Sequence, residues 1–401
     1  MAFAPRYLRT LLIPATIALA VVAGIAAAAA TWRTSAPAMA LRISPHDAVA
    51  SMVSVERRLA SAEEPTKLLR DAAPLGRDAL RREPLNPRAI RLLAMVAEVE
   101  GKRSATLDLL ALSQRVSRRD LGTHLALIEH YSGTENVDAT LNQYDLALST
   151  SGPAGDTLLP ILTSALAEPE IRQKLAVYVH ADRPWLRGFL VYAIANAEQP
   201  ENVAMLLALA GGLPKHPDYR EFETQLLDRL IASKKYAAAH DFFLTLPGAS
   251  GAMLKTVDFT LPTTNRAFGP MAWYLSDQPE ASAQVGEDGN LWVRAAPGKS
   301  GTAAQRILYL PHGSYVFRQT AEFAQDAGSA VWELRCMRTS GATMIWHRPV
   351  PPTRTATVVS AQIDIPPDCP VQMLTLGAAG EDSQQEAEIT FSGISMRSAN
   401  R

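Results

Sequence analysis

The sequence has few residues of the kinds that build metal sites or nucleic-acid interfaces. Among its 401 residues are two cysteines and eight histidines, and the histidines are scattered. A structural zinc site needs four clustered Cys or His ligands, so this composition excludes one. Lys and Arg number 39 against 40 Asp and Glu, which leaves a formal net charge of -1 and no basic block. Binding a phosphate backbone needs clustered positive charge, so we predict no nucleic-acid partner.

Common catalytic motifs are missing as well. The chain contains no H-E-x-x-H, G-x-S-x-G or G-x-G-x-x-G pattern. The stretch APGKSGT resembles a phosphate-binding loop, but that motif needs a glycine five residues before Gly298, where Val293 stands. We therefore predict a protein that is not an enzyme and that uses neither a metal nor an organic cofactor. An enzyme whose catalytic carboxylates are dispersed along the chain is the alternative.

An apolar run follows the N-terminus. The stretch LLIPATIALAVVAGIAAAAATW carries no charge over roughly 20 residues, about the length of a membrane-spanning helix. Arg6 and Arg9 precede it, and basic residues favour the cytoplasmic side of a membrane. We predict a cytoplasmic segment at 1–9, a transmembrane anchor at 10–32 and a linker at 33–42. The protein would then be a single-pass protein of a bacterial inner membrane, with its body in the periplasm.

A cleaved signal peptide is the alternative for the same run. The stretch APAMA offers small residues at Ala38 and Ala40, ahead of a mature chain that would begin at Leu41. The apolar run is longer than the roughly 7–15 residues of a signal peptide's apolar region, which favours the anchor. Both alternatives export the body of the protein.

Export gives the two cysteines a role. Cys336 and Cys369 are even in number and both lie in the C-terminal part of the chain. Thiols in an oxidising compartment form disulfides, so we predict one bridge between them. Two buried free thiols are the alternative.

A repeat of 34 residues marks the middle of the chain. The triplet Ala105-Thr106-Leu107 returns as Ala139-Thr140-Leu141, and the same offset places Ser113 on Ala147 and, one unit earlier, on Ala79. The stretch REPLNPRAIRLLAMVAEVEGKRSATLDLLALSQRVS resembles the tetratricopeptide repeat, which has this period and small residues where paired helices touch. We predict a helical repeat domain at 43–250, with Ala105 and Ala139 at equivalent helix contacts. Chance recurrence of one triplet is the alternative.

The resemblance implies a binding surface. Stacked helical hairpins expose a concave face that usually binds a peptide or protein, so an envelope protein or peptide is the predicted partner. Arg115, Arg118 and Arg119 could line an anion-accepting groove on it. A solvated basic face is the alternative for these three residues.

The helical pattern ends near residue 250. After a short linker at 251–254, short alternating segments such as LWVRAA and AVWELRCM follow between turn signals, which predicts an antiparallel β-sandwich of the jelly-roll type at 255–401. RILYLPHGSYVFR and EAEITFSGISM resemble strands of galactose-binding-like and carbohydrate-binding domains. This resemblance implies a polysaccharide as a second possible partner.

Four of the six tryptophans lie in this region. Sugar rings stack on exposed aromatic faces, so Trp346 beside His347 and Arg348, together with Trp292, are the candidate binding residues. Core filling is the alternative for each tryptophan, and Trp332, which shares a strand face with Leu334, fits the core.

The leading hypothesis is a non-enzymatic, membrane-anchored periplasmic scaffold that docks a protein partner through the helical repeats, in cell-envelope or exopolysaccharide assembly. The alternative is a carbohydrate-binding protein in which the sandwich binds a glycan and the helices only space it from the membrane.

Overall fold

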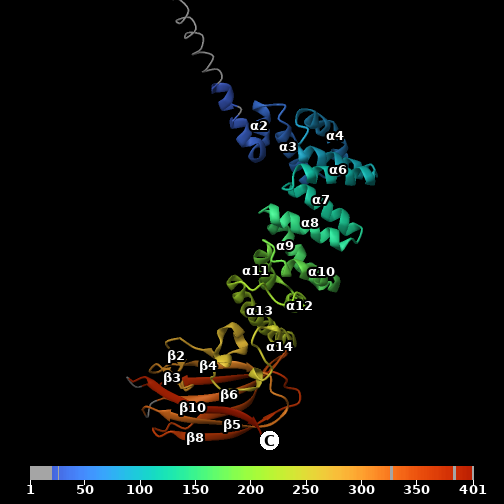
Figure 1. The fold of residues 1–401 in the computed structure, drawn as a ribbon. Helices are drawn as coiled ribbons and strands as arrows, with labels where there is room; N and C mark the ends of the chain where they lie inside the picture. Colours follow the sequence, from blue (N-terminus) through green and yellow to red (C-terminus); the bar gives the residue numbers. More distant parts are fainter. Residues whose placement is uncertain (1–19, 26, 326–327, 383–384, 400–401) are drawn as a thin grey trace, which may run out of the picture. The chain divides into compact units, whose positions relative to one another are not determined.

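The protein consists of helices followed by strands (Figure 1). The computed structural model describes residues 20–25, 27–325, 328–382 and 385–399. The chain forms two compact units, and the boundary between them lies between Leu158 and Leu159. The predicted order, a helical part and then an antiparallel two-sheet sandwich, is confirmed.

The predicted anchor lies partly outside the described residues, which include 20–25 and 27–32 but not 10–19 or 26. Within the described part, no helix combines the length and the apolar character needed to cross a bilayer.

The first unit is a series of antiparallel helix pairs, in which α3 packs on α4, α5 on α6 and α7 on α8. Side chains at the N-caps start several of these helices: Asn86, Asp120 and Asn136 each accept a hydrogen bond from the backbone N–H three residues ahead. The helices are α2 (Pro37–Ile43), α3 (Ala48–Ala60), α4 (Pro65–Arg82), α5 (Pro87–Val99), α6 (Arg103–Val116), α7 (Leu121–Gly133) and α8 (Val137–Thr150).

The 34-residue offset recurs in the helix boundaries. Helix α7 begins and ends 34 residues after α5, and α8 begins and ends 34 residues after α6. The turns agree too, since Gly101 and Glu135 both adopt positive φ angles of 73° and 55°. The 34-residue period relates two successive helical hairpins, α5–α6 and α7–α8. It does not establish membership of the tetratricopeptide family.

The contact positions differ from those predicted. Ala105 is exposed and Ala139 is half-buried, so the expectation that they form equivalent helix contacts is wrong for Ala105. The buried positions at the same offset are Ala79, Ser113 and Ala147, with exposed fractions of 3%, 0% and 0%. The shared triplets begin near the N-termini of α6 and α8, where Thr106 and Leu141 are buried but not the alanines that precede them.

Two matched substitutions test this packing. Ala147→Leu is expected to lower the stability of the first unit by about 1–3 kcal/mol, because the added methylenes have no space in a filled contact. The same change at exposed Ala105 is expected to stay within about 0.5 kcal/mol. Urea denaturation of the two variants measures both. Equal losses at the two positions would show that the helix contacts are placed wrongly.

The second unit begins with helices. Helix α10 packs against α12, α12 against α14, and α11 against α13. The elements are the end of α9 (Ala154–Ser164), η1 (Ala165–Ala167), α10 (Pro169–His180), α11 (Leu186–Asn196), α12 (Pro200–Leu209), η2 (Pro217–Tyr219), α13 (Arg220–Ala232) and α14 (Tyr236–Thr245).

A sandwich of two five-stranded antiparallel sheets completes the unit. The strand orders are β1-β4-β9-β6-β7 and β2-β3-β10-β5-β8. Every second side chain of a strand points into the space between the sheets. Trp332 is fully buried there, as predicted. The ring centroids of Phe317 and Phe391 lie 5.4 and 6.1 Å from that of Trp332. The strands are β1 (Tyr274–Leu275), β2 (Ala281–Val285), β3 (Leu291–Ala295), β4 (Ser300–Leu308), β5 (Gly313–Phe323), β6 (Ser329–Arg338), β7 (Gly341–Val350), β8 (Thr357–Ile365), β9 (Gln372–Ala379) and β10 (Ala387–Ser398).

The segment between the helices and the sandwich contains η3 (Met253–Lys255), α15 (Leu261–Thr264) and η4 (Arg266–Met271). Arg306 of β4 binds this segment, because its buried guanidinium donates hydrogen bonds to the carbonyls of Met253, Thr256 and Met271. Burial lowers the pKa of Arg306 to about 10.

The sandwich also contacts the preceding helices directly. The hydroxyl of Tyr309 donates to the carbonyl of Tyr236 at 2.8 Å, and Lys234 Nζ donates to the carbonyl of Thr339 at 2.8 Å. The predicted linker at 251–254 therefore lies inside one compact unit, and the sandwich has contacts that a fragment beginning at residue 255 would lose.

The predicted disulfide joins Cys336 and Cys369, whose Cα atoms lie 5.5 Å apart. Cys336 lies on the inward face of β6 together with Trp332 and Leu334, and Cys369 lies in the loop that leads to β9. The bridge ties the end of one strand to the entry of its neighbour.

Candidate functional site

Trp292 is the large aromatic side chain that the sandwich exposes most. Strand β3 alternates, with Leu291, Val293 and Ala295 buried and Trp292 and Arg294 outside. Successive side chains of a strand point to opposite faces, so every second residue lies on the solvent face. A tryptophan at such a position does not contribute to the core. The exposed fraction of Trp292 is 51%. This indole lies on the outer face of the sheet β2-β3-β10-β5-β8, which we call the outer B face.

Polar side chains surround Trp292 on the outer B face. In the strand register, Gln284 of β2 and Thr390 of β10 lie directly opposite Trp292 on either side, and Glu322 of β5 lies opposite Thr390. Residues directly opposite have Cβ atoms about 4.5–5.5 Å apart. The register thus forms one row across four strands that contains an amide, an indole, a hydroxyl and a carboxylate.

The turn between β2 and β3 positions the indole. A Cβ atom at Gly286 would lie 3.5 Å from Cζ2 and 3.6 Å from Cη2 of Trp292, so the ring rests beside a residue without a side chain. Asp288 holds the turn closed by accepting hydrogen bonds from the backbone N–H and the side-chain amide of Asn290. Asx turns of this kind restrict the backbone. The indole is therefore supported from one side.

The three predicted binding residues of β7 do not lie on the outer B face. Trp346 and Arg348 lie opposite Leu334 and Trp332 in the register of β6, whereas His347 lies opposite Glu333 on the other side of the sheet.

Trp346 is half-buried and packs against Phe317, with ring centroids 5.3 Å apart. Core filling, the alternative, accounts for this contact. His347 lies 3.6 Å from the carboxylate of Glu333. Of the four predicted candidates in the sandwich, only Trp292 belongs to the row described above.

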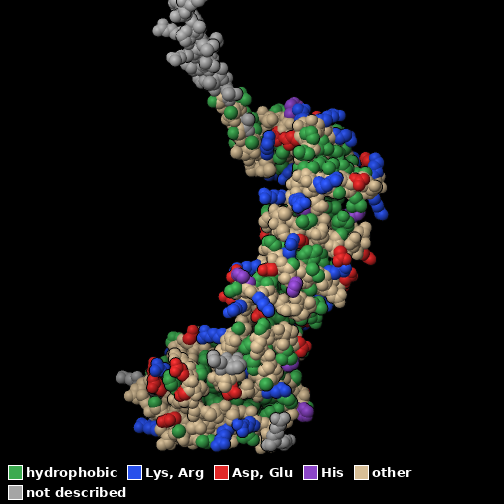
Figure 2. All heavy atoms as spheres, viewed as in Figure 1, with side chains coloured by type: hydrophobic (Ala, Val, Ile, Leu, Met, Phe, Trp, Pro, Cys, Tyr) green, Lys and Arg blue, Asp and Glu red, His purple; other side chains and the backbone are tan. Residues whose placement is uncertain are grey.

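The three predicted arginines of the helical part lie near one another in the chain but do not form a closed groove. Arg115 is in the last turn of α6, where a cation compensates the helix dipole, and Arg118 and Arg119 lie in the exposed turn before α7. The backbone carbonyl of Arg118 faces Nε2 of buried His124 at 3.0 Å. Figure 2 shows basic and acidic side chains interspersed over the face of the molecule that it draws.

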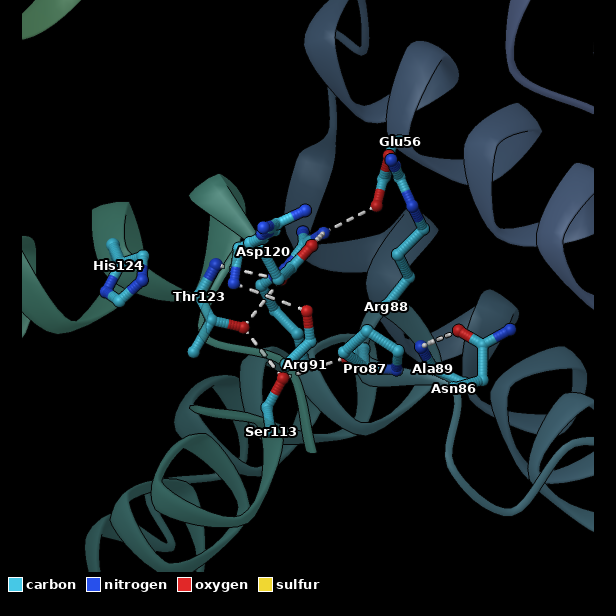
Figure 3. A network of polar contacts seen from close by, with 12 residues as sticks. Glu56, Asn86, Pro87, Arg88, Ala89, Arg91, Ser113, Asp120, Thr123 and His124 are labelled. Carbon is cyan, nitrogen blue, oxygen red and sulfur yellow. Dashed lines mark hydrogen bonds and ion pairs between the residues drawn. The ribbon is translucent and has the colours of Figure 1, made fainter. Parts of the chain in front are cut away.

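A buried charge network connects the helices of the first unit (Figure 3). Arg91 of α5 donates to Glu56 of α3 at 2.6 Å and to Asp120, the N-cap of α7, at 2.9 Å. Asp120 also accepts from the backbone N–H of Thr123 at 3.0 Å and from its hydroxyl at 2.6 Å. The hydroxyls of Thr123 and Ser113 share a further hydrogen bond of 2.7 Å.

Burial alone would raise the pKa of Asp120, but the hydrogen bonds and charge of Arg91 outweigh it and lower that pKa. For Arg91, burial lowers the pKa, but Asp120 and Glu56 together raise it. Both groups are thus charged at neutral pH and satisfied by each other. The network links α3, α5, α6 and α7, and the mutual satisfaction of its charges stabilises the packing of these helices. Polar residues at buried positions of a helical pattern were the only sign of it in the sequence.

The described residues contain no group of three or more His, Cys, Asp or Glu side chains that could hold a metal ion. A cavity of about 450 Å³ lies between α5, α6 and α7 of the first unit. Its lining is mainly apolar and includes Met95, Val99 and Leu110, with Glu98 and Glu129 among its polar residues.

No protein-family model and no curated protein matches the sequence. Among solved structures, the C-terminal region resembles the sandwiches of carbohydrate-binding modules. One is described as "CBM4 structure and function" (15% identity, 35% of this chain and 99% of that chain, TM-score 0.27). Another is the N-terminal cellulose-binding domain of a β-1,4-glucanase from Cellulomonas fimi (14%, 32% and 90%, 0.23), and a third is a xylan-binding domain (18%, 32% and 88%, 0.23).

Proposed function

We propose that the C-terminal sandwich binds a carbohydrate on its outer B face. The single observation that carries the proposal is Trp292, half-exposed at the centre of a polar row. A pyranose ring has an apolar face of C–H groups and an edge of hydroxyls. An indole offers a flat apolar surface for the first, and Gln284, Thr390 and Glu322 offer donors and acceptors for the second. This proposal adopts the alternative function predicted from the sequence.

The rest of the chain would then hold the outer B face at a distance from the membrane. We propose that the protein is not an enzyme, that residues 10–32 anchor it in a bacterial inner membrane and that its body lies in the periplasm. The disulfide supports an oxidising compartment. The helical hairpins, which we propose to be tetratricopeptide-like, would act as a spacer. No feature of the described residues favours the docking of a protein partner over this spacing role.

Replacing Trp292 tests the glycan site. Trp292→Ala is expected to raise the dissociation constant for a glycan identified on an array by about 30-fold, since truncation of a central aromatic anchor costs about 2 kcal/mol or more. The whole chain is used, because the sandwich contacts the preceding helices. Isothermal titration calorimetry measures the change.

Tyr274→Ala is the matched control, because Tyr274 is an aromatic residue of the other sheet with an exposed fraction of 46%. It is expected to leave affinity unchanged. Equal affinity of wild-type protein and Trp292→Ala, with both folded by circular dichroism, would sink the proposal.

A further inference from the structure

Two arginines lie together on the outer B face. Arg318 of β5 lies opposite Ser395 of β10, and Arg397 of β10 lies opposite Val316 of β5, two residues along from Arg318. The two arginines are therefore diagonal neighbours on adjacent strands. Such positions lie about 7–8 Å apart, within reach of long side chains. Both arginines are exposed.

No carboxylate of the described residues forms an ion pair with either guanidinium. The third arginine of this face differs, because Arg294 pairs with Glu388 across β3 and β10 at 3.3 Å. Glu322 lies four residues from Arg318 along β5, about 13 Å away at 3.3 Å per residue. Two like charges placed side by side repel each other, and a bound anion would remove that repulsion.

The surroundings of the pair are small and hydroxylated. Ser395 and Ser360 lie opposite Arg318 on its two neighbouring strands, so no bulky side chain lies directly beside it. A bulge between Ser392 and Ser395, with Gly393 at a φ angle of 61°, interrupts β10 between the row of Trp292 and the arginines. Bulges bend a strand and re-aim the side chains that follow. Arg397 follows this bulge on β10, and Arg318 lies opposite Ser395 at its far end.

The spacing places both features under one extended ligand. Arg318 lies two strands and four residues from Trp292 in the register, about 16 Å at 4.8 Å per strand and 3.3 Å per residue. A chain of several sugar units that stacks on Trp292 can reach Arg318 and Arg397 along the same surface.

We propose that the glycan bound on the outer B face is anionic, and that Arg318 and Arg397 bind the carboxylate of a uronic acid unit. The planar fork of an arginine matches the two oxygens of a carboxylate. Sulfated sugars share the negative charge and are the other source of such an anion. The inference rests on the proposed glycan site. It adds that the ligand is negatively charged and names the residues that bind the charged group.

The experiment compares a polyuronate with its neutral methyl ester. Polygalacturonate and its fully methyl-esterified form are titrated into the whole wild-type chain and into Arg318→Gln/Arg397→Gln, with dextran sulfate as a third probe. The wild-type chain is expected to bind polygalacturonate at least about tenfold more tightly than the ester, with affinity that falls as salt rises. The double variant is expected to lose this preference and this salt dependence while it keeps its affinity for the ester. Arg294→Gln is the matched control, because it removes one positive charge from the same face at a residue that is already in an ion pair. This variant is expected to keep the preference for polygalacturonate over the ester.

The outcomes separate this inference from the site beneath it. Equal binding of the acid and the ester by the wild-type chain, with loss on Trp292→Ala, overturns the anionic assignment and leaves the glycan site standing. An equal loss in Arg294→Gln shows general charge attraction and also overturns it. Tight binding of dextran sulfate without polygalacturonate overturns the carboxylate assignment. No binding to these probes or to any array glycan overturns both proposals.

Discussion

Replacing Asp120 with alanine is expected to destabilise the first unit by about 3–5 kcal/mol, because Arg91 would remain buried with only one of its two counter-charges. Arg91 has an exposed fraction of 8% and lies between two acidic side chains, so it cannot recover the lost interaction from water. Asp120 is also the N-cap of α7. The expected result is a lower urea midpoint, with faster amide exchange in α5 and α7.

Two variants separate the contributions. Asp120→Asn keeps a capping oxygen, which is worth about 1 kcal/mol, and is expected to lose less than Asp120→Ala. Asp78→Ala removes one partner of an exposed pair with Arg82 and is the matched control for loss of a carboxylate, expected to cost at most about 0.5 kcal/mol. A loss in Asp120→Ala no larger than in Asp78→Ala would show that the buried network does not stabilise the helices.

The same residue should give the first unit a characteristic dependence on pH. The pKa of Asp120 is lower in the folded protein than its ordinary value of 3.8. The unfolded chain therefore binds its proton more readily. The stability that Asp120 contributes is fully present above about pH 4 and is lost as pH falls through the lowered folded pKa. Asp120→Asn should remove this acid-dependent part, which urea denaturation at several pH values can measure.

Reduction of the bridge between Cys336 and Cys369 is expected to lower the stability of the second unit by about 3–4 kcal/mol. The two residues are 33 positions apart, and in the chain-entropy model a loop of this length gives that value. Both cysteines are buried in the sandwich core, so their thiols would also have to be accommodated there. Urea unfolding with and without a reductant measures the change, and mass spectrometry after alkylation counts the thiols.

Cys336→Ala/Cys369→Ala is the control for the reductant. This variant should be destabilised under both conditions and should not respond to reduction. The first unit, which has no cysteine, should unfold identically in either solution. If the oxidised native protein carried two alkylatable thiols, the bridge itself would be absent in solution.

The succession of helices and then strands was readable from the sequence because it depends on local periodicity. Apolar residues spaced three and four apart define one face of a helix, and alternation such as LWVRA defines the inner face of a strand. The 34-residue offset was also readable, and it matches the boundaries of two successive helix pairs. The pairing of Cys336 with Cys369 was predicted from their number and the predicted compartment.

Strand order, strand geometry and packing together decided which exposed residues share a surface. Trp346, His347 and Arg348 are consecutive, yet β-strand geometry separates His347 from its neighbours, and packing on Phe317 half-buries Trp346. Trp292, Thr390 and Arg318 are up to about one hundred residues apart in the chain, and they share a face because β3, β10 and β5 are neighbours in one sheet.

The sequence by itself determined the class of each segment, since local pattern and composition select helix, strand and turn with little help from distant residues. Tertiary structure decided which side chains are buried and which lie beside one another. Helix packing buried Arg91 between Glu56 and Asp120 and left Ala105 in solvent, and sheet order brought Arg318 and Arg397 together. These outcomes depend on contacts between residues far apart in the chain, which no local pattern encodes.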